Sequence, residues 1–203
     1  MANPIRHGLS GLARFSGRDT RGQFWPYAAL VVALLFLILF VGMSMVIGSI
    51  FEEMQRFAAE HPEAATVHAG PGSYSIQIEA GHPDAPVPDF GAFIAVLALG
   101  VVAAVALLAA AVSRRLHDSG GSALWGMLPL PFLTFGLAAF PIVTRQLMAA
   151  PEPDLGLFFM MFFNNMLYIA ALGTLVVMLC LRGTQGPNRF GPVPAAQGAS
   201  PTS

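Results

Sequence analysis

Four long stretches of the chain contain no charged residue, and they limit the folds that it can adopt. They cover residues 22–51, 90–113, 119–144 and 155–181. The hydrocarbon core of a bilayer is about 30 Å thick, and a helix of roughly 20 apolar residues crosses it. Each stretch is long enough to do so. We therefore predict an all-α membrane protein, a four-helix transmembrane bundle with spans at about 27–50, 90–112, 123–143 and 157–181.

The composition argues against a soluble protein. Charged residues make up 10% of the chain, whereas soluble domains carry about 25%, so a water-exposed surface would have too few charges. The apolar run at 30–40 lacks the polar stripe of a soluble amphipathic helix. A chain of 203 residues is too short to bury four such helices in a soluble core. We expect one membrane domain over 1–193, with an extracytoplasmic loop at 51–89 and a disordered tail at 194–203.

The charged residues are distributed asymmetrically around the four stretches. All ten basic residues are arginine. Of the eleven acidic residues, only Asp19 and Asp118 lie on the side that carries most of the arginines. Because short basic segments stay in the cytoplasm, this pattern predicts that both termini and the loop between spans two and three are cytoplasmic. The arginines on that side are Arg6, Arg14, Arg18, Arg21, Arg114, Arg115, Arg182 and Arg189.

The third stretch is the least regular of the four. It contains Pro129, Pro131 and Pro141. Proline removes a backbone donor, so we expect this helix to be kinked or locally broken. A re-entrant segment is the alternative, but it would place Arg182 and Arg189 on the outer side, against the charge rule.

The loop at 51–89 is the largest segment outside the predicted membrane. Residues 52–60 are expected to continue the first helix into water. The alternating sequence YSIQIE at 74–79 predicts a short strand. We expect no partner for it within so short a segment, so that it pairs with another copy of the chain or stays irregular.

The same loop contains several metal-binding residue types. His61, His68 and His82 lie near Glu63 and Asp84 in the sequence. Their spacing matches no known ligand pattern, so solvated loop histidines are the simpler interpretation. We therefore expect no metal and no other cofactor.

Three short motifs flank the spans on the arginine-rich side. They are FSGRDTRGQFW at 15–25, SRRLHDSGGS at 113–122 and GTQGPNRFGP at 183–192. In this order, and over nearly the whole chain, they resemble the bacterial inner-membrane family known as domain of unknown function 805. The resemblance implies a four-span bundle in the bacterial inner membrane and no established activity.

The chain departs from the pattern of that family at two places. Gly121 stands where the family usually has a basic residue, and Leu124-Trp125 stands where it has paired tryptophans. These two departures imply that any anion site is weaker in this chain.

The motifs are expected to bring eight polar side chains to one membrane face. In one interpretation Asp118 pairs with an arginine and fixes the turn between spans, while the other arginines contact phospholipid headgroups. In the other, the arginines form a specific pocket for an anion or a protein partner. Guanidinium groups bind phosphate with two hydrogen bonds, and each basic residue beside an anionic leaflet gains about 1 kcal/mol. The candidate residues are Arg18, Arg21, Arg114, Arg115, His117, Asp118, Asn188 and Arg189.

Binding is better supported than catalysis or transport. No serine or cysteine nucleophile is spaced to form a triad with His117 and Asp118. The spans contain no Asp, Glu, Lys, Arg or His, which ion-coupled carriers need. We expect a non-enzymatic binding, scaffold or regulatory protein. Its expected partners are anionic lipid headgroups and either a protein partner or a second copy of the chain, and no nucleic acid. The alternative is a small-solute transporter or channel component that uses Asn164, Asn165 and the broken third span.

Overall fold

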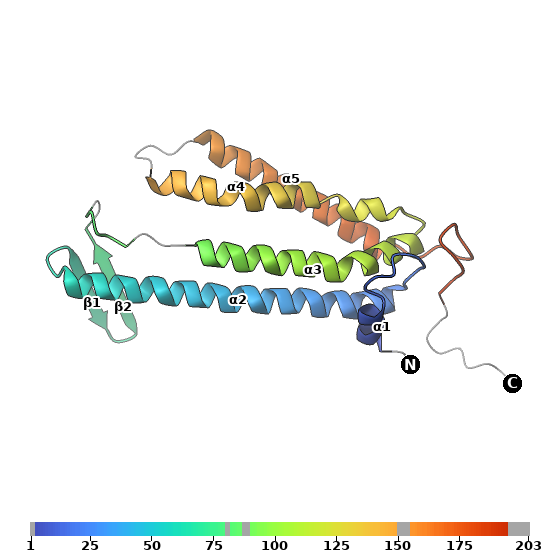
Figure 1. Ribbon diagram of the computed structural model, residues 1–203, viewed down its shortest axis with the longest axis horizontal. Helices are drawn as coiled ribbons and strands as arrows, with labels where there is room; N and C mark the ends of the chain where they lie inside the picture. The colour runs from blue at the N-terminus through green and yellow to red at the C-terminus, as the bar shows by residue number, and fades with distance from the viewer. Residues whose placement is uncertain (1–2, 80–81, 87–89, 150–154, 195–203) are drawn as a thin grey trace. The chain divides into compact units, whose positions relative to one another are not determined.

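The computed structural model describes residues 3–79, 82–86, 90–149 and 155–194, and within them the chain is mostly helical (Figure 1). Two strands form a single antiparallel pair. The predicted tail at 194–203 lies outside the described residues except for Pro194. In chain order the elements are α1 (Pro4–Ser10), α2 (Arg21–Glu60), β1 (Ala65–Gly70), β2 (Ser73–Ile78), α3 (Gly91–Asp118), a 3₁₀ helix η1 (Ala123–Met127), α4 (Leu130–Ala149) and α5 (Leu155–Cys180).

Four helical segments are long and apolar enough to cross a membrane, as predicted. They are Arg21–Glu60, Gly91–Asp118, Ala123–Gln146 and Leu155–Cys180. Their large apolar side chains stay exposed, for example Phe40 at 72% and Leu99 at 71%. Exposed apolar surface of this extent is typical of a membrane-contacting protein. The first of these helices continues to Glu60, which confirms that residues 52–60 extend the first helix; that they lie in water stays a prediction.

The chain divides into two compact units. The first unit comprises Met1–Phe36 and Ala98–Ser203, and the second comprises Leu37–Leu97. The single domain over 1–193 stays a prediction. The core of the first unit is formed by α2, α3 and α5, where small alanines of α3 allow the helix backbones to approach closely. Its buried residues are Phe24, Tyr27, Ala28, Val31, Ala104, Ala111, Leu116, Leu175 and Leu179.

The third predicted span begins with η1 and continues as α4. Pro129 lies between the two helices and Pro141 lies inside α4. The bend that these prolines predict stays a prediction. In the first unit α4 lies beside α5 (Figure 1). The side-chain amide of Asn164 donates to the carbonyl of Phe132 at 3.0 Å and so links the two helices.

The second unit contains a β-hairpin, which corrects one prediction. The strand predicted at 74–79 does have a partner in the same loop, because β1 pairs with β2 from Ala65 opposite Ile78 to Gly70 opposite Ser73. Only Pro71 and Gly72 connect the strands, and Gly72 adopts a φ of +79°, which glycine allows without strain. The sequence ATVHAG of β1 contains alanine and glycine, which rarely form strands, so its pattern did not indicate one.

Candidate functional site

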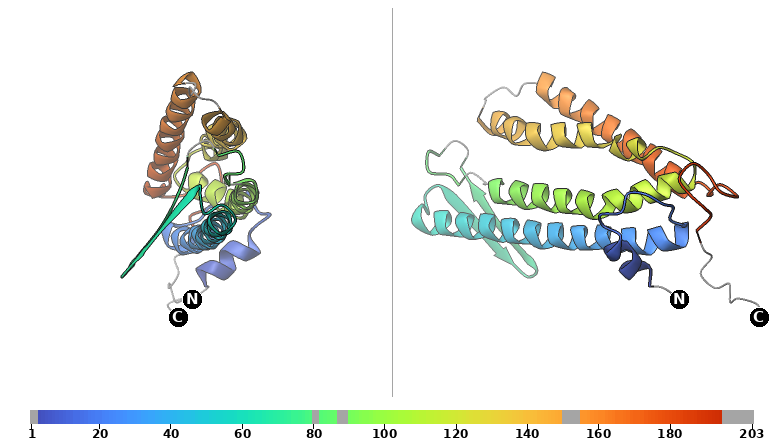
Figure 2. Two further views of the ribbon diagram at one scale, coloured as in Figure 1. Left: turned by 90° about the vertical axis from the view of Figure 1, so that its left-hand side faces the viewer. Right: turned by 45° about the vertical axis from the view of Figure 1, so that its right-hand side comes forward.

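Three segments that are far apart in the sequence meet at one end of the first unit (Figure 2). The first is the N-terminal segment, which includes α1 and residues 11–20. The second is the C-terminal end of α3. The third is the segment at 182–194 that follows α5. Hydrogen bonds from arginine side chains to a carboxylate and to backbone carbonyls join all three.

The N-terminal segment is ordered by α1, which the sequence analysis did not predict. The Asn3 side chain accepts the amide of Ile5 at 2.9 Å, and Pro4 occupies the first turn. This Asn-Pro pair is a typical helix start and was a usable signal. Gly8 allows α1 to lie against α2, because a Cβ at this position would overlap the ring of Tyr27.

Asp118, at the end of α3, joins most of the predicted site. It is 5% exposed. Its Oδ1 accepts a hydrogen bond from Nε of Arg18 at 3.1 Å and forms an ion pair with Nη2 of the same arginine at 3.0 Å, and its Oδ2 accepts a hydrogen bond from Nη1 of Arg115 at 2.5 Å. The expectation that Asp118 pairs with an arginine is therefore confirmed, with two arginines rather than one.

The guanidinium groups of Arg18 and Arg115 also bind backbone carbonyls at the end of α5 and beyond it. A helix leaves its last carbonyls without intrahelical partners, and cationic donors satisfy them well. Every nitrogen of the two groups has an acceptor within the protein, so both groups are committed to holding the fold together. The carbonyls belong to Leu179, Leu181, Thr184 and Gly186.

Asp19 is a second buried carboxylate and was not among the predicted site residues. It is 2% exposed. Its Oδ2 accepts a hydrogen bond from Nε of Arg114 at 2.7 Å, and its Oδ1 lies 3.0 Å from Nε2 of His7. Asp19 is one of only two acids on the arginine-rich side of the sequence, which was a signal for its role. His7 had no comparable signal.

His117, Asn188 and Arg189 form the outer part of the site. The imidazole of His117 stacks on the ring of Phe190 with centroids 3.8 Å apart, and Arg189 lies over the same ring at 4.6 Å. The side-chain amide of Asn188 donates to the carbonyl of His117 at 3.0 Å. These contacts hold the segment at 182–194 against the end of α3.

Arg21 differs from the other predicted site residues. It lies exposed at the start of α2, and no hydrogen bond or ion pair within the described residues joins its side chain to the cluster. The structure thus brings seven of the eight predicted residues together and leaves Arg21 at the surface. We call the buried charged residues Arg18, Asp19, Arg114, Arg115 and Asp118 the arginine cluster.

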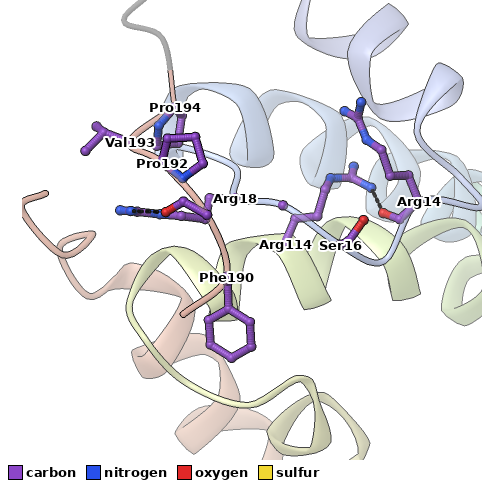
Figure 3. Close-up of a pocket in the computed structure, with 10 residues that line it drawn as sticks. Arg14, Ser16, Arg18, Arg114, Phe190, Pro192, Val193 and Pro194 are labelled. Atoms are coloured by element: carbon purple, nitrogen blue, oxygen red, sulfur yellow. Dashed lines mark hydrogen bonds between the residues drawn. The ribbon is translucent and has the colours of Figure 1, made fainter. Parts of the chain in front are cut away.

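A pocket of about 490 Å³ lies beside the arginine cluster (Figure 3). Polar groups come from the N-terminal segment and α3, and apolar groups come from the C-terminal segment. Arg114 contributes to its wall although it is only 1% exposed. The lining residues are Arg14, Ser16, Gly17, Arg18, Arg114, Phe190, Gly191, Pro192, Val193 and Pro194.

One nitrogen of Arg114 is not paired within the described residues. Nε donates to Asp19, and Nη1 donates to the carbonyls of Gly11 and Arg14 at 2.7 and 2.5 Å. Nη2 is buried and has no acceptor in the part of the chain that the structure describes. A buried donor of a charged group costs free energy when it has no acceptor, so an oxygen atom that accepted a hydrogen bond from this nitrogen would be stabilising.

Comparison with known proteins confirms the family resemblance and adds no activity. The sequence model of a family described as "Protein of unknown function (DUF805)" matches residues 12–192, which include all three motifs. Neither a curated protein nor a solved structure matches the chain.

Proposed function

We propose a function from the geometry of this chain, which belongs to the family described as Protein of unknown function (DUF805). The protein binds the phosphate group of an anionic lipid at the cytoplasmic face of a bacterial inner membrane. It does so without catalysis, as a scaffold or regulatory protein. The observation that carries this proposal is that Arg114 lines the pocket and that its buried Nη2 has no acceptor within the described residues.

The charge of the arginine cluster supports an anionic ligand. The cluster holds three buried guanidinium groups, those of Arg18, Arg114 and Arg115, but only the two carboxylates of Asp19 and Asp118. One positive charge is therefore uncompensated within the cluster. Burial strengthens its attraction for an anion, because the effective dielectric constant is lower than in water.

The walls of the pocket suit a phosphate that is joined to an apolar group. Arg14 and Arg114 supply guanidinium groups, which bind phosphate oxygens strongly. Phe190, Pro192 and Val193 supply apolar surface on the other side. A lipid headgroup presents this combination, with its phosphate at the membrane edge and its carbon chains next to it.

The position of the pocket in the sequence supports a membrane-edge ligand. Arg14 and Arg18 precede the first charge-free stretch, and Arg114 directly follows the second. The lining residues at 190–194 follow the fourth. The positive-inside rule assigns all of these segments to the cytoplasmic side, where anionic headgroups attract basic residues.

A lipid-retention experiment tests the proposal. Wild-type protein and the variants Arg14→Gln and Arg21→Gln are purified in a neutral detergent, and the phosphatidylglycerol and phosphatidylethanolamine retained per chain are measured by mass spectrometry. Both arginines are exposed and lie next to the first span, but only Arg14 lines the pocket. A neutral micelle has no anionic leaflet, so the measurement reports bound lipid rather than surface attraction.

We expect Arg14→Gln to reduce retained phosphatidylglycerol about fivefold, which corresponds to about 1 kcal/mol, and Arg21→Gln to leave it unchanged. Equal losses in the two variants, or equal retention of the two lipids by wild-type protein, would refute a phosphate pocket specific for anionic lipid. A parallel purification in millimolar inorganic phosphate identifies the source of the phosphate. Retained lipid in that buffer supports a headgroup, and complete displacement by phosphate would indicate a soluble anion instead.

The transport alternative has less support from the geometry. Asn164 donates its side-chain amide to the carbonyl of Phe132 and so serves the contact between α5 and α4. Asn165 is exposed on α5. Neither arrangement forms a polar path, so we retain binding as the proposed function.

A further inference from the structure

A second cluster of polar side chains lies in the second unit, at the base of the β-hairpin. α2 ends at Glu60, and a tight turn follows in which the amide of Ala64 donates to the carbonyl of His61 at 3.0 Å. After the hairpin, the amide of Glu79 donates to the carbonyl of Ala64 at 2.8 Å. This bond extends the pairing of the strands and draws the residues on either side of the hairpin together.

The hairpin brings together a set of residues whose spacing in the sequence indicated no metal site. His61 and Glu63 precede β1, and His82 follows β2. One ligating atom from each of the three side chains lies within 4.8 Å of the others. The 18 residues that separate Glu63 from His82 in the sequence include both strands, so a pattern search over adjacent positions does not find the set.

An aromatic residue positions both imidazole rings. Phe57 is 5% exposed, and its ring centroid lies 4.8 Å from that of His61 and 5.1 Å from that of His82. The two imidazole centroids are 4.9 Å apart. Packing against a buried ring limits the rotation of both imidazoles, so their proximity is built into this unit.

The third group, Glu63, can move toward the two imidazoles. Its side chain is 70% exposed, and its Oε1 already lies 3.4 Å from Nδ1 of His61. Zinc binds imidazole nitrogen at about 2.0–2.1 Å and carboxylate oxygen at about 2.0–2.2 Å, so ligating atoms in a zinc site are closer together than 4.8 Å. Rotation of the exposed Glu63 side chain and a small shift of one imidazole close that difference.

We propose that His61, Glu63 and His82 bind a divalent transition-metal ion, and that Zn²⁺ is the ion that they fit best. Two neutral imidazoles and one carboxylate are a ligand set typical of zinc, and three protein ligands leave a fourth position for water. Magnesium and calcium prefer oxygen ligands and fit this set poorly. The site binds zinc at moderate affinity, because Nδ1 of His82 also accepts the amide of Asp84 at 3.2 Å and a metal competes with that bond.

Zinc titration of the full-length protein tests the proposal. Detergent-solubilised protein is treated with a chelator, dialysed, and titrated with zinc chloride by calorimetry, for wild type, Glu63→Gln, His82→Ala and His68→Ala. His68 is the matched control, since it is an exposed histidine on β1 of the same hairpin and outside the cluster. Cobalt chloride provides a second readout, because Co²⁺ with nitrogen and oxygen ligands in a tetrahedral site absorbs visible light.

We expect wild type and His68→Ala to bind one zinc ion per chain, and His82→Ala and Glu63→Gln to bind it at least about tenfold more weakly. Wild type loaded with Co²⁺ should show visible absorption that His82→Ala lacks. Since Glu63 is exposed, its substitution tests the site even if His82→Ala disturbs the hairpin. The proposal is wrong if wild type binds no zinc at millimolar concentration, or if Glu63→Gln binds zinc as tightly as His68→Ala.

Discussion

Replacement of Asp118 by asparagine should destabilise the protein severely. The carboxylate accepts one hydrogen bond from Arg18 and one from Arg115, and it forms a second ion-pair contact with Arg18, all inside the protein. The substituted side chain would keep one acceptor oxygen, but its amide group would face guanidinium donors and the negative charge would be lost. Three buried guanidinium groups would then remain with the single carboxylate of Asp19.

The expected loss follows from the burial of these groups. Removing one partner of a buried ion pair costs about 3–5 kcal/mol, because the remaining charge stays desolvated. Asparagine retains part of the hydrogen bonding, so we expect about 3 kcal/mol for Asp118→Asn. The loss should change little with salt concentration, because ions do not reach a buried pair.

The measurement is the free energy of unfolding in mixed micelles, obtained by titration with a denaturing detergent and followed by tryptophan fluorescence. Glu53→Gln is the control, since Glu53 is an exposed acid on α2 and its loss should change stability by less than about 0.5 kcal/mol. A double-mutant cycle with Arg18→Gln should give a coupling energy of about 1–3 kcal/mol. A loss below about 1 kcal/mol for Asp118→Asn, together with additive effects in the cycle, would show that the carboxylate does not hold the cluster.

Two further substitutions test the packing of the first unit by the same unfolding titration. Gly183→Ala should cost about 1–3 kcal/mol, because its Cβ would overlap the carboxylate of Asp118. The control is Gly173→Ala, whose Cβ would meet no atom within 4 Å; an equal loss in both variants would contradict the overlap. Asn164→Leu should cost about 0.6–1.7 kcal/mol through the lost bond between α5 and α4, whereas Asn165→Leu should cost less. The reverse order would contradict the assignment of the interhelical bond to Asn164.

The helices of the fold could be predicted from the sequence, because the hydropathy of a membrane span is a local property. Each charge-free stretch lies wholly or largely within one of the four candidate spans. The hairpin was only half predicted, since β2 alternates clearly and β1 does not. The turn at Pro71 and Gly72 sets which residues of the two strands pair, and it can be recognised as a hairpin turn only when both strands are known.

The residues of the candidate site could be predicted from the sequence, but their burial and their contacts could not. All ten basic residues are arginine, and nothing local distinguishes Arg115, which is 0% exposed, from the exposed Arg21. The difference arises because Arg115 reaches a carboxylate and the end of α5, which are brought together only in the folded protein. His7 was missed for the same reason, since its role depends on the approach of α1 to α3, whereas the isolated acid Asp19 among the arginines was a signal that was not used.

The arginine cluster also has a consequence for the order of events during synthesis. Arg18 emerges from the ribosome before the first span, Asp118 after the second, and Thr184 only after the fourth, yet all three meet in the folded protein. Until residues 184–186 emerge, Arg18 lacks the carbonyls that complete its hydrogen bonds. In that period it can act as a charge that orients the chain in the membrane. When Thr184 follows, these bonds can form, and reversing α2, α3 or α5 would then require a buried ion-pair network to be dismantled.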